Sequence, residues 1–316
     1  MTRRQFSQVT GLAALAVATR QLTGASAAAA PNPAARPPVH FFSKHFQFLD
    51  YEEMSEAAAK IGCDGLELSV RPRGHVEPEN VKRDLPRAVK AMQAHGLKPL
   101  MMATALASPQ SPFAEDVLKT AADEGLRYYR LSYYDFEKGE SWKQCLDRAR
   151  AEFAGLAKLN ARYGLHGAYQ NHAGDHVGSF ISDVAYLLDG TDVRWQGSQY
   201  DIRHATVEGG TAWPLGLRLL KDHIRTIVLK DFRWEETASG LKVVNVPLGE
   251  GVVDFKRYFK LLREYGINPL ISMHAEYELG GGEKGNKTPT WPKEKILAFY
   301  RRDIETYHRL WDESFA

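Results

Sequence analysis

Two patterns of apolar residues alternate along the chain from residue 39 onward. Short continuous apolar runs predict buried β-strands, whereas segments with apolar residues every three or four positions predict amphipathic helices. The predicted strands are 39–46, 65–70, 98–103, 128–134, 167–172, 195–201, 226–231 and 270–277. The predicted helices are 51–61, 79–95, 112–124, 142–163, 180–188, 215–223, 255–265 and 292–311. The chain is therefore predicted to repeat one strand–helix unit eight times.

The residues at the ends of the predicted helices agree with this pattern. Asp50 and Asp254 precede two of the helices, where their side chains can accept hydrogen bonds from free backbone N–H groups. Glycine adopts the left-handed conformation that ends many helices, and it follows five of the predicted ones. These glycines are Gly62, Gly96, Gly125, Gly164 and Gly266.

Strand–helix alternation predicts parallel strands joined by right-handed crossovers. Eight such units close into a (β/α)8 TIM barrel, which takes about 250 residues. The alternative is an open doubly wound sheet, which usually carries a glycine-rich phosphate-binding loop after its first strand. Here the first strand is followed by Lys44-His45-Phe46-Gln47, without glycine. We therefore predict an α/β protein with a single-domain TIM barrel over residues 39–316.

The first 30 residues differ from the rest of the chain. Arg3 and Arg4 precede a short alanine-rich apolar stretch, and small residues at 25–30 then provide a cleavage site. This order is typical of a secretory signal, and the arginine pair indicates a twin-arginine signal. We predict a signal peptide at 1–30, a proline-rich linker at 31–38, and a periplasmic or secreted protein. The alternative is a disordered alanine-rich N-terminus. The apolar stretch is too short to span a membrane, and we expect no span in the mature protein.

Charge and cysteine content exclude several classes of protein. The chain has 41 Lys and Arg against 39 Asp and Glu, and a net charge of +2. Cleavage after residue 30 removes three arginines and no acid, which changes +2 to −1. Neither value indicates a nucleic-acid partner, because such proteins need a basic surface. The two cysteines are too few for a disulfide scaffold or a cysteine zinc site.

Polar side chains gather at the ends of the last four predicted strands. In a TIM barrel the reactive groups lie at the carboxyl ends of the strands, and side chains alternate inward and outward along each strand. In the last strand, Ile271, Met273 and Ala275 form the apolar face. The opposite faces and the strand ends bring seven polar residues to one mouth: Gln170, His172, Asp201, His204, Lys230, His274 and Glu276. We predict the reactive site there.

A second group of polar residues is predicted on the opposite wall. Arg71 and His75 follow the second strand, His45 follows the first, and Tyr134 ends the fourth. A basic wall that faces an acidic one suits a polyhydroxylated or anionic small molecule. We predict that these four residues, together with His172, contact the substrate. Each has a structural alternative, since a buried histidine is usually a hydrogen-bonded core residue and loop arginines are often solvated.

Six short motifs in this order resemble those of the xylose isomerase-like TIM-barrel superfamily, the sugar phosphate isomerase and epimerase group. They read IGCDGLEL at 61–68, YQNHAG at 169–174, YDIRH at 200–204, VLKDF at 228–232, PLGEG at 247–251 and HAEY at 274–277. The resemblance covers about residues 39–312. It implies the barrel fold and a small-molecule carbohydrate substrate.

The resemblance also implies a metal site. In that family a divalent cation, commonly Mn²⁺, Mg²⁺ or Zn²⁺, is bound at strand ends five to eight by glutamate, aspartate, histidine and glutamate. Asp201 matches the aspartate, and Glu276 matches the last glutamate. This chain has Gln170 at the first ligand position and Val228 at the histidine position. A glutamine oxygen binds a hard cation with less charge than a carboxylate, and valine cannot bind one.

Two interpretations of this departure stay open. In the first interpretation, a divalent metal is bound by Gln170, Asp201 and Glu276, with His172, His204 or His274 as replacement ligands. Alternatively, Lys230 supplies the positive charge that a cation normally provides.

The activity implied by the resemblance is proton abstraction next to a carbonyl, through an enediolate. Glu276 is the expected base or ligand, and His204 and His274 belong to the expected catalytic set. Lys230, with its pKa lowered by burial, is expected to stabilise the oxyanion or deliver the proton. Because export argues against a phosphorylated metabolite, we expect an isomerase or epimerase of a free or oxidised sugar.

Other functions remain compatible with the same barrel. A 3-keto-glycoside lyase or hydratase would use the same abstraction and then expel a substituent. A non-catalytic carbohydrate-binding barrel would account for the altered ligand positions. An endonuclease-type relative would need more metal ligands and a basic groove. A homo-oligomer is compatible with the fold.

Overall fold

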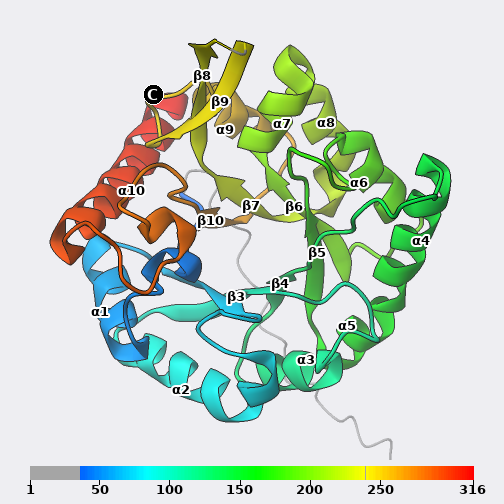
Figure 1. Ribbon diagram of the computed structural model, residues 1–316, viewed down its shortest axis with the longest axis horizontal. Helices are drawn as coiled ribbons and strands as arrows, with labels where there is room; N and C mark the ends of the chain where they lie inside the picture. The colour runs from blue at the N-terminus through cyan, green and yellow to red at the C-terminus, as the bar shows by residue number, and fades with distance from the viewer. Residues whose placement is uncertain (1–35, 239) are drawn as a thin grey trace, which may run out of the picture. The chain divides into compact units, whose positions relative to one another are not determined.

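Eight parallel strands form a closed barrel in the order β1-β10-β7-β6-β5-β4-β3-β2 (Figure 1). This computed structural model describes residues 36–238 and 240–316, so the predicted signal peptide and most of the predicted linker lie outside the described residues. The barrel strands are β1 Val39–Phe42, β2 Gly65–Val70, β3 Lys98–Thr104, β4 Tyr128–Arg130, β5 His166–Gln170, β6 Gln196–Asp201, β7 Ile224–Leu229 and β10 Leu270–Met273. The predicted TIM barrel is confirmed.

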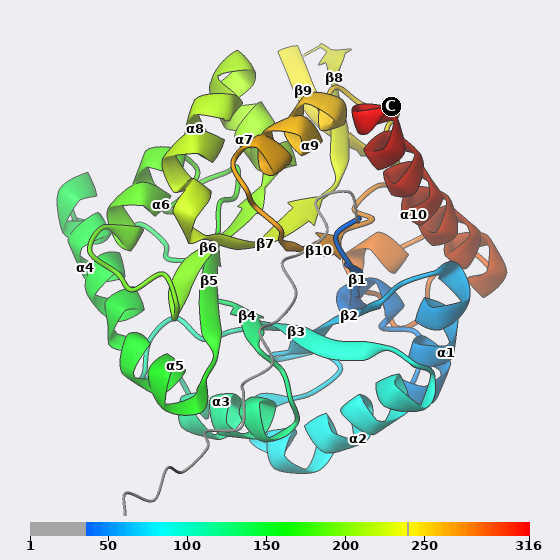
Figure 2. The ribbon, with the colours of Figure 1, turned by 180° about the vertical axis from the view of Figure 1, so that it is seen from behind.

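Helices surround this barrel on all sides, as the views from the front and from behind agree (Figures 1 and 2). They are α1 Tyr51–Ile61, α2 Val81–Ala94, α3 Ala114–Asp123, α4 Trp142–Gly155, α5 Ala157–Tyr163, α6 Ile181–Leu188, α7 Ile202–Gly209, α8 Trp213–Leu220, α9 Phe255–Glu264 and α10 Lys293–Phe315. The short helix α7 was not predicted. In the described part of the chain, no helix is both long and apolar enough to cross a bilayer.

The predicted helix signals form the expected contacts. The Asp50 side chain accepts a hydrogen bond from the Glu53 backbone N–H at 2.9 Å, and Asp254 caps α9 through Arg257 in the same way. Gly62 ends α1 with a φ of 94°, in the left-handed region that glycine adopts without strain. Local sequence therefore determines where these helices begin and end.

The apolar core lies between the barrel and the helices. The outward side chains of β10, Ile271 and Met273, are fully buried in it, as is Ala275 just beyond the strand. This confirms the predicted alternation in the last strand, so that Ser272 and the residues in phase with it point into the barrel.

The barrel interior is polar as well as apolar. Glu67 on β2 is fully buried and accepts hydrogen bonds from Gln199 Nε2 at 2.9 Å and Ser272 Oγ at 2.6 Å. These partners come from β6 and β10, on other sides of the ring. Such bonds satisfy a charge that would be costly to bury alone, and they connect the inward faces of the strands beneath the site.

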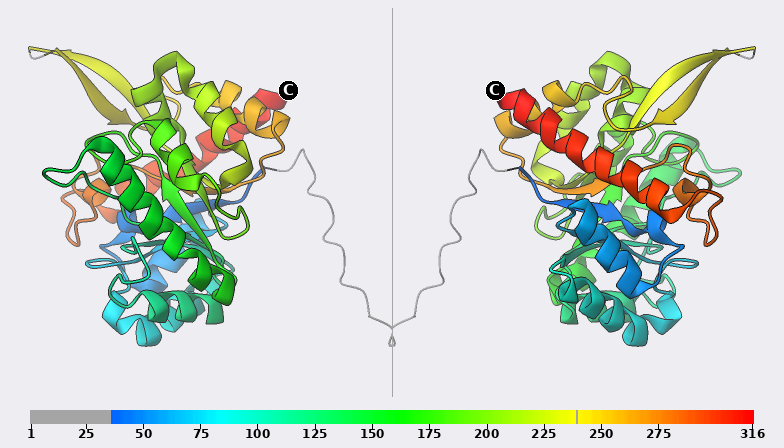
Figure 3. Two further views of the ribbon diagram at one scale, coloured as in Figure 1. Left: turned by 90° about the vertical axis from the view of Figure 1, so that its right-hand side faces the viewer. Right: turned by 90° about the vertical axis from the view of Figure 1, so that its left-hand side faces the viewer.

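A two-stranded antiparallel hairpin, β8 Asp231–Thr237 and β9 Gly240–Val246, follows β7 directly. It extends away from the ring of helices (Figure 3). Trp234 and Leu241 on the hairpin are 45% and 67% exposed. The base of the hairpin lies beside the strand ends, where Lys230 immediately precedes β8.

Candidate active site

A polar cavity of about 160 Å³ lies at the carboxyl ends of the strands. Its lining combines cations, one carboxylate and aromatic rings: Phe42, Lys44, Arg71, Arg130, Tyr133, Gln170, His172, Lys230, His274 and Glu276. A wider hollow of about 590 Å³ adjoins it and shares Lys44, Arg71, Arg130 and Tyr133. This is the end of a TIM barrel at which reactive groups are found.

An ion cluster occupies the floor of this cavity. Lys230 Nζ lies 3.2 Å from Asp201 Oδ2 and 3.0 Å from Glu276 Oε2. The side chains of Lys230 and Asp201 are 3% and 0% exposed, whereas that of Glu276 is 22% exposed. Glu276 is therefore the carboxylate of the cluster that a ligand can reach.

The backbone fixes each member of the cluster. Asp201 ends β6 and caps α7, since its Oδ1 accepts a hydrogen bond from the His204 backbone N–H at 3.1 Å. Lys230 is the first residue after β7. Glu276 lies three residues past β10, where its backbone carbonyl accepts a hydrogen bond from Asn245 Nδ2 on β9 at 3.1 Å. The base of the hairpin thus positions the loop that carries Glu276.

Two pKa shifts follow from this arrangement. Burial alone would lower the pKa of Lys230, but the carboxylates of Asp201 and Glu276 outweigh burial and raise that pKa above its ordinary value. The predicted lowering of the Lys230 pKa is therefore wrong. Burial opposes ionisation of Glu276, yet Lys230, His274 and Lys44 lower its pKa well below the usual range. The resting site contains a fixed ammonium and an ionised carboxylate.

Gln170 presents its amide nitrogen to the cluster. Its Nε2 donates to Asp201 Oδ2 at 2.7 Å, and its Oε1 accepts from the Tyr133 hydroxyl at 2.7 Å. An ionised carboxylate can only accept hydrogen bonds, so the amide cannot turn its oxygen toward Asp201 without losing that bond and placing two acceptors against each other. The oxygen that would bind a cation faces Tyr133 instead.

These residues do not fit the divalent cation that the family resemblance implies. Val228, which has no donor atom, pairs in register with Asp201 on the neighbouring strand. Both Asp201 oxygens already accept hydrogen bonds, and the Lys230 ammonium lies between the two carboxylates. Across residues 36–238 and 240–316, no three side chains of His, Cys, Asp or Glu are grouped to bind a metal ion.

The structure brings two of the predicted histidines to the cavity. His274 stacks on Phe42 with a centroid distance of 4.7 Å, and its Nε2 lies 3.4 Å from Glu67 Oε2. Its Nδ1 lies 3.5 Å from Glu276 Oε1. His172 also lines the cavity, and burial lowers its pKa to about 4, which keeps the ring neutral at physiological pH.

His204 lies behind Asp201 and does not line the cavity. Its Nδ1 accepts hydrogen bonds from the Ala173 backbone N–H and from Arg203 Nη1, both at 3.0 Å. Burial, with Lys230 and His172 adding to it, holds its pKa well below the ordinary value. In this position His204 supports the cluster without direct access to a ligand.

Three predicted substrate contacts do not reach the cavity. Tyr134 packs on Tyr169 and donates to the Ala107 carbonyl at 2.6 Å. His75 Nε2 bonds the Phe46 carbonyl at 3.2 Å, and His45 is fully buried among aromatic rings. Tyr134 points elsewhere because β4 ends at Arg130, after which the two-residue alternation no longer applies.

Four lining residues were not predicted from the sequence, namely Phe42, Lys44, Arg130 and Tyr133. Lys44 lies in a short 3-10 helix, Ser43–Phe46, and its Nζ is 3.7 Å from Glu276 Oε1. Arg130 shares the inward strand face with Tyr128, so the same alternation could have identified it. Tyr133 has no comparable signal, because it lies in a loop.

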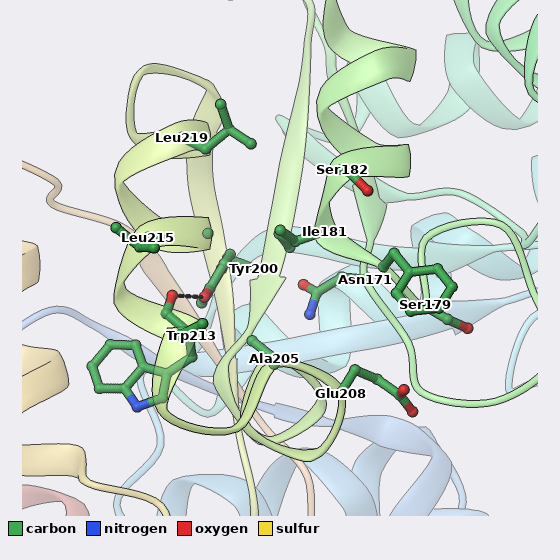
Figure 4. A pocket seen from close by; sticks show the side chains of 14 residues that line it. Asn171, Ser179, Ile181, Ser182, Tyr200, Ala205, Glu208, Trp213, Leu215 and Leu219 are labelled. Atoms are coloured by element: carbon green, nitrogen blue, oxygen red, sulfur yellow. Dashed lines mark hydrogen bonds between the residues drawn. The ribbon is translucent and has the colours of Figure 1, made fainter.

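A second pocket, of about 290 Å³, lies outside the barrel between α6 and α8 (Figure 4). Its walls are mostly apolar and include Ile181, Trp213 and Leu215, and Glu208 is the one charged residue among them. The titratable groups needed for chemistry are at the strand ends instead.

The closed barrel and its polar strand ends define a TIM-barrel protein with an enzyme-like site. The family model described as xylose isomerase-like TIM barrel matches residues 55–298. The chain therefore belongs to the xylose isomerase-like TIM-barrel family.

Individual relatives are distant. An inosose dehydratase from Bacillus velezensis is 28% identical over 134 residues, which are 39% of this chain and 44% of that protein. The chain thus matches less than half the length of this relative. A 3-keto-D-glucoside 4-epimerase structure from E. coli has 13% identity and a TM-score of 0.65, covering 87% of this chain and 100% of that one. A D-psicose 3-epimerase with D-tagatose from Clostridium cellulolyticum H10 has 11% identity and a TM-score of 0.64, covering 87% and 99%. At these identities the two structures show the shared fold alone.

Proposed function

We propose that this protein is an enzyme that removes a proton from the carbon next to the carbonyl of a free or oxidised sugar. One observation carries the proposal: the ionised Glu276 carboxylate lines a cavity with the Lys230 ammonium 3.0 Å away. A carboxylate base and a fixed cation are the two groups that such a step needs.

Glu276 takes the proton from carbon, the electron pair of the C–H bond forms a C=C bond to the carbonyl carbon, and the π pair of the carbonyl moves onto its oxygen. Lys230 stabilises the oxyanion that results, because its raised pKa keeps it charged throughout. The low pKa of Glu276 makes it a weak base, but the cations responsible for that low pKa also favour the enediolate. The activation barrier is therefore lowered mainly by stabilisation of the oxyanion, not by the strength of the base.

The cavity wall opposite the cluster suits an anionic group on the substrate. Arg71 and Arg130 lie 5.2 and 5.6 Å from the Phe42 ring centroid. Among the described residues, no carboxylate lies within ion-pair distance of either guanidinium, and the buried Arg130 Nε has no hydrogen-bond partner. Two guanidinium groups that have no carboxylate partner in the described part of the chain match a carboxylate well. We therefore propose a sugar oxidised to an acid as the preferred substrate, which also agrees with the predicted export signal.

Two types of reaction can proceed from the enediolate. Isomerisation or epimerisation returns the proton to carbon, and elimination breaks a neighbouring C–O bond so that the hydroxide leaves as water. Epimerisation by two carboxylate bases on opposite sides of the reacting carbon is disfavoured. Glu276 is the one carboxylate among the lining residues, and Gln170 cannot take a proton. Lys44, close to Glu276, can protonate a leaving hydroxide. This proton donor and the similarity to inosose dehydratases support elimination as the second candidate function, beside isomerisation or epimerisation.

Incubation in D2O tests the shared step. We would compare inosose, a 3-keto-glucoside, neutral ketohexoses and keto-sugar acids as substrates. Deuterium incorporated into recovered substrate or an isomer indicates reprotonation, whereas an unsaturated product indicates elimination. A panel in which sugars bind, no carbon-bound hydrogen exchanges and no unsaturated product forms would contradict the proposal and favour a carbohydrate-binding barrel.

Lys44 should produce an alkaline limb in the pH profile of kcat/KM. Burial lowers the pKa of Lys44, and Lys230, Arg71 and Arg130 lower it further, although Glu276 opposes them. Because only the protonated amine can donate a proton, the rate should fall as pH rises through this lowered pKa. Lys44→Arg keeps the charge but does not titrate in this range, so its slower reaction should lack the limb. An unchanged limb in Lys44→Arg would exclude Lys44 as the proton donor.

A further inference from the structure

We propose that the Lys230 ammonium takes the place of the divalent cation in this barrel, so that the protein works without a metal ion. The inference concerns the cofactor rather than the reaction. Its test needs no substrate, so its failure can be distinguished from failure of the proposed function.

The position of Lys230 is the first argument. Its Nζ bridges Asp201 and Glu276, which stand at the two ligand positions retained from the family pattern, at 3.2 and 3.0 Å. A hard cation binds oxygen at roughly 2.0 to 2.6 Å, so a metal there would have to displace the ammonium. Lys230 extends inward from the end of β7, two residues past Val228, which stands where the family has histidine.

The remaining donors are the second argument. Gln170 directs nitrogen rather than oxygen at the cluster, and its oxygen is bonded to Tyr133. Asp201 Oδ1 caps α7. The site lacks two of the family's metal ligands and holds the Lys230 ammonium between the two carboxylates that remain, and a site with fewer anionic ligands needs less positive charge.

Charge balance is the third argument. Asp201 and Glu276 carry two negative charges, and Lys230 and Lys44, both near Glu276, carry two positive charges. These four charges therefore sum to zero without a metal. A divalent cation would add two charges beside Arg71 and Arg130, which already line the cavity. Repulsion among these groups would oppose metal binding.

Metal content and Mn²⁺-dependent thermal unfolding of the full chain test the inference. Wild type should contain substoichiometric Mn, Mg, Zn, Fe and Co, and neither Mn²⁺ nor a chelator should shift its Tm. Lys230→Ala removes the ammonium and opens the space between the carboxylates, so Mn²⁺ should raise its Tm by several degrees through binding to the folded state. Lys230→Met is the matched control, because it also removes the charge but fills the space, and Mn²⁺ should leave its Tm unchanged.

Metal content of the wild type keeps the test decisive if Lys230→Ala folds poorly, because that measurement needs no variant. Lys230→Ala with Gln170→Glu adds the carboxylate that the family pattern has at that position, and this variant should bind Mn²⁺ more tightly than Lys230→Ala. Stoichiometric metal in the wild type, with a lower Tm after chelation, would overturn the inference. So would failure of the alanine-containing variants to bind Mn²⁺ when circular dichroism shows them folded, because the ammonium would then not stand at a cation position.

Discussion

Replacing Glu276 with glutamine should lower kcat by roughly 10²- to 10⁴-fold, the usual contribution of a positioned acid–base group. The change keeps the shape of the side chain and removes its negative charge together with its ability to take a proton. Lys230 retains its contact with the fully buried Asp201, so the fold should survive. Steady-state kinetics on the substrate identified by deuterium exchange would measure the loss, and circular dichroism would check the fold.

Glu278→Gln is the matched control for this experiment. Glu278 lies two residues further along, is exposed, and accepts a hydrogen bond from the Gly280 backbone N–H at 2.9 Å, which a glutamine oxygen can also accept. Its kcat should equal that of the wild type. Wild-type turnover in Glu276→Gln would remove Glu276 from the mechanism and, with it, the proposed proton abstraction.

The fold was predictable because each element carries a local signal. Apolar periodicity located the strands and most helices, and residues such as Asp50 and Gly62 marked helix ends that the structure reproduces. The predicted strands extend too far at their carboxyl ends: β4 stops at Arg130 and β10 at Met273. At those points the hydrogen bonds between strands end and a loop begins, and apolar content alone does not predict where this happens.

The site was predictable only as far as the strands extend. Asp201 lies on β6 and Lys230 directly follows β7, so alternation placed both correctly within the barrel. Tyr133 and Lys44 reach the cavity from a loop and a 3-10 helix, where no two-residue period applies. Arg130 follows the alternation and was overlooked, although its position on β4 is inward.

The pKa of Lys230 shows a different limit. Burial was predictable from the inward position, and burial alone lowers a lysine pKa. The pKa of Lys230 is raised instead, because two carboxylates lie within 3.2 Å of its Nζ, one from β6 and one from the loop after β10. Distances between residues far apart in the chain decide the direction of the shift, and a single sequence does not contain them.

Lys230→Met should lower kcat/KM by on the order of 10²- to 10³-fold, the effect of removing one oxyanion-stabilising group. It should also destabilise the fold, because Asp201 stays buried without its cation. Removing one partner of a buried ion pair typically costs about 3 to 5 kcal/mol. Kinetics and denaturant unfolding would measure the two effects separately. Lys143→Met, at a 75% exposed lysine on α4 that lines neither cavity, should change neither.

The double variant Lys230→Met with Asp201→Asn separates the catalytic role of Lys230 from its structural one. Asparagine removes the buried charge that Lys230 neutralises, so most of the lost stability should return. Activity should stay low, because no cation remains to stabilise the oxyanion. If the double variant regained both stability and rate, Lys230 would be a structural ion-pair partner, and stabilisation of the enediolate would have to come from Lys44 or Arg130. Restored stability without restored rate is the result that the cavity geometry supports, since Lys230 contacts the reachable Glu276 as well as the buried Asp201.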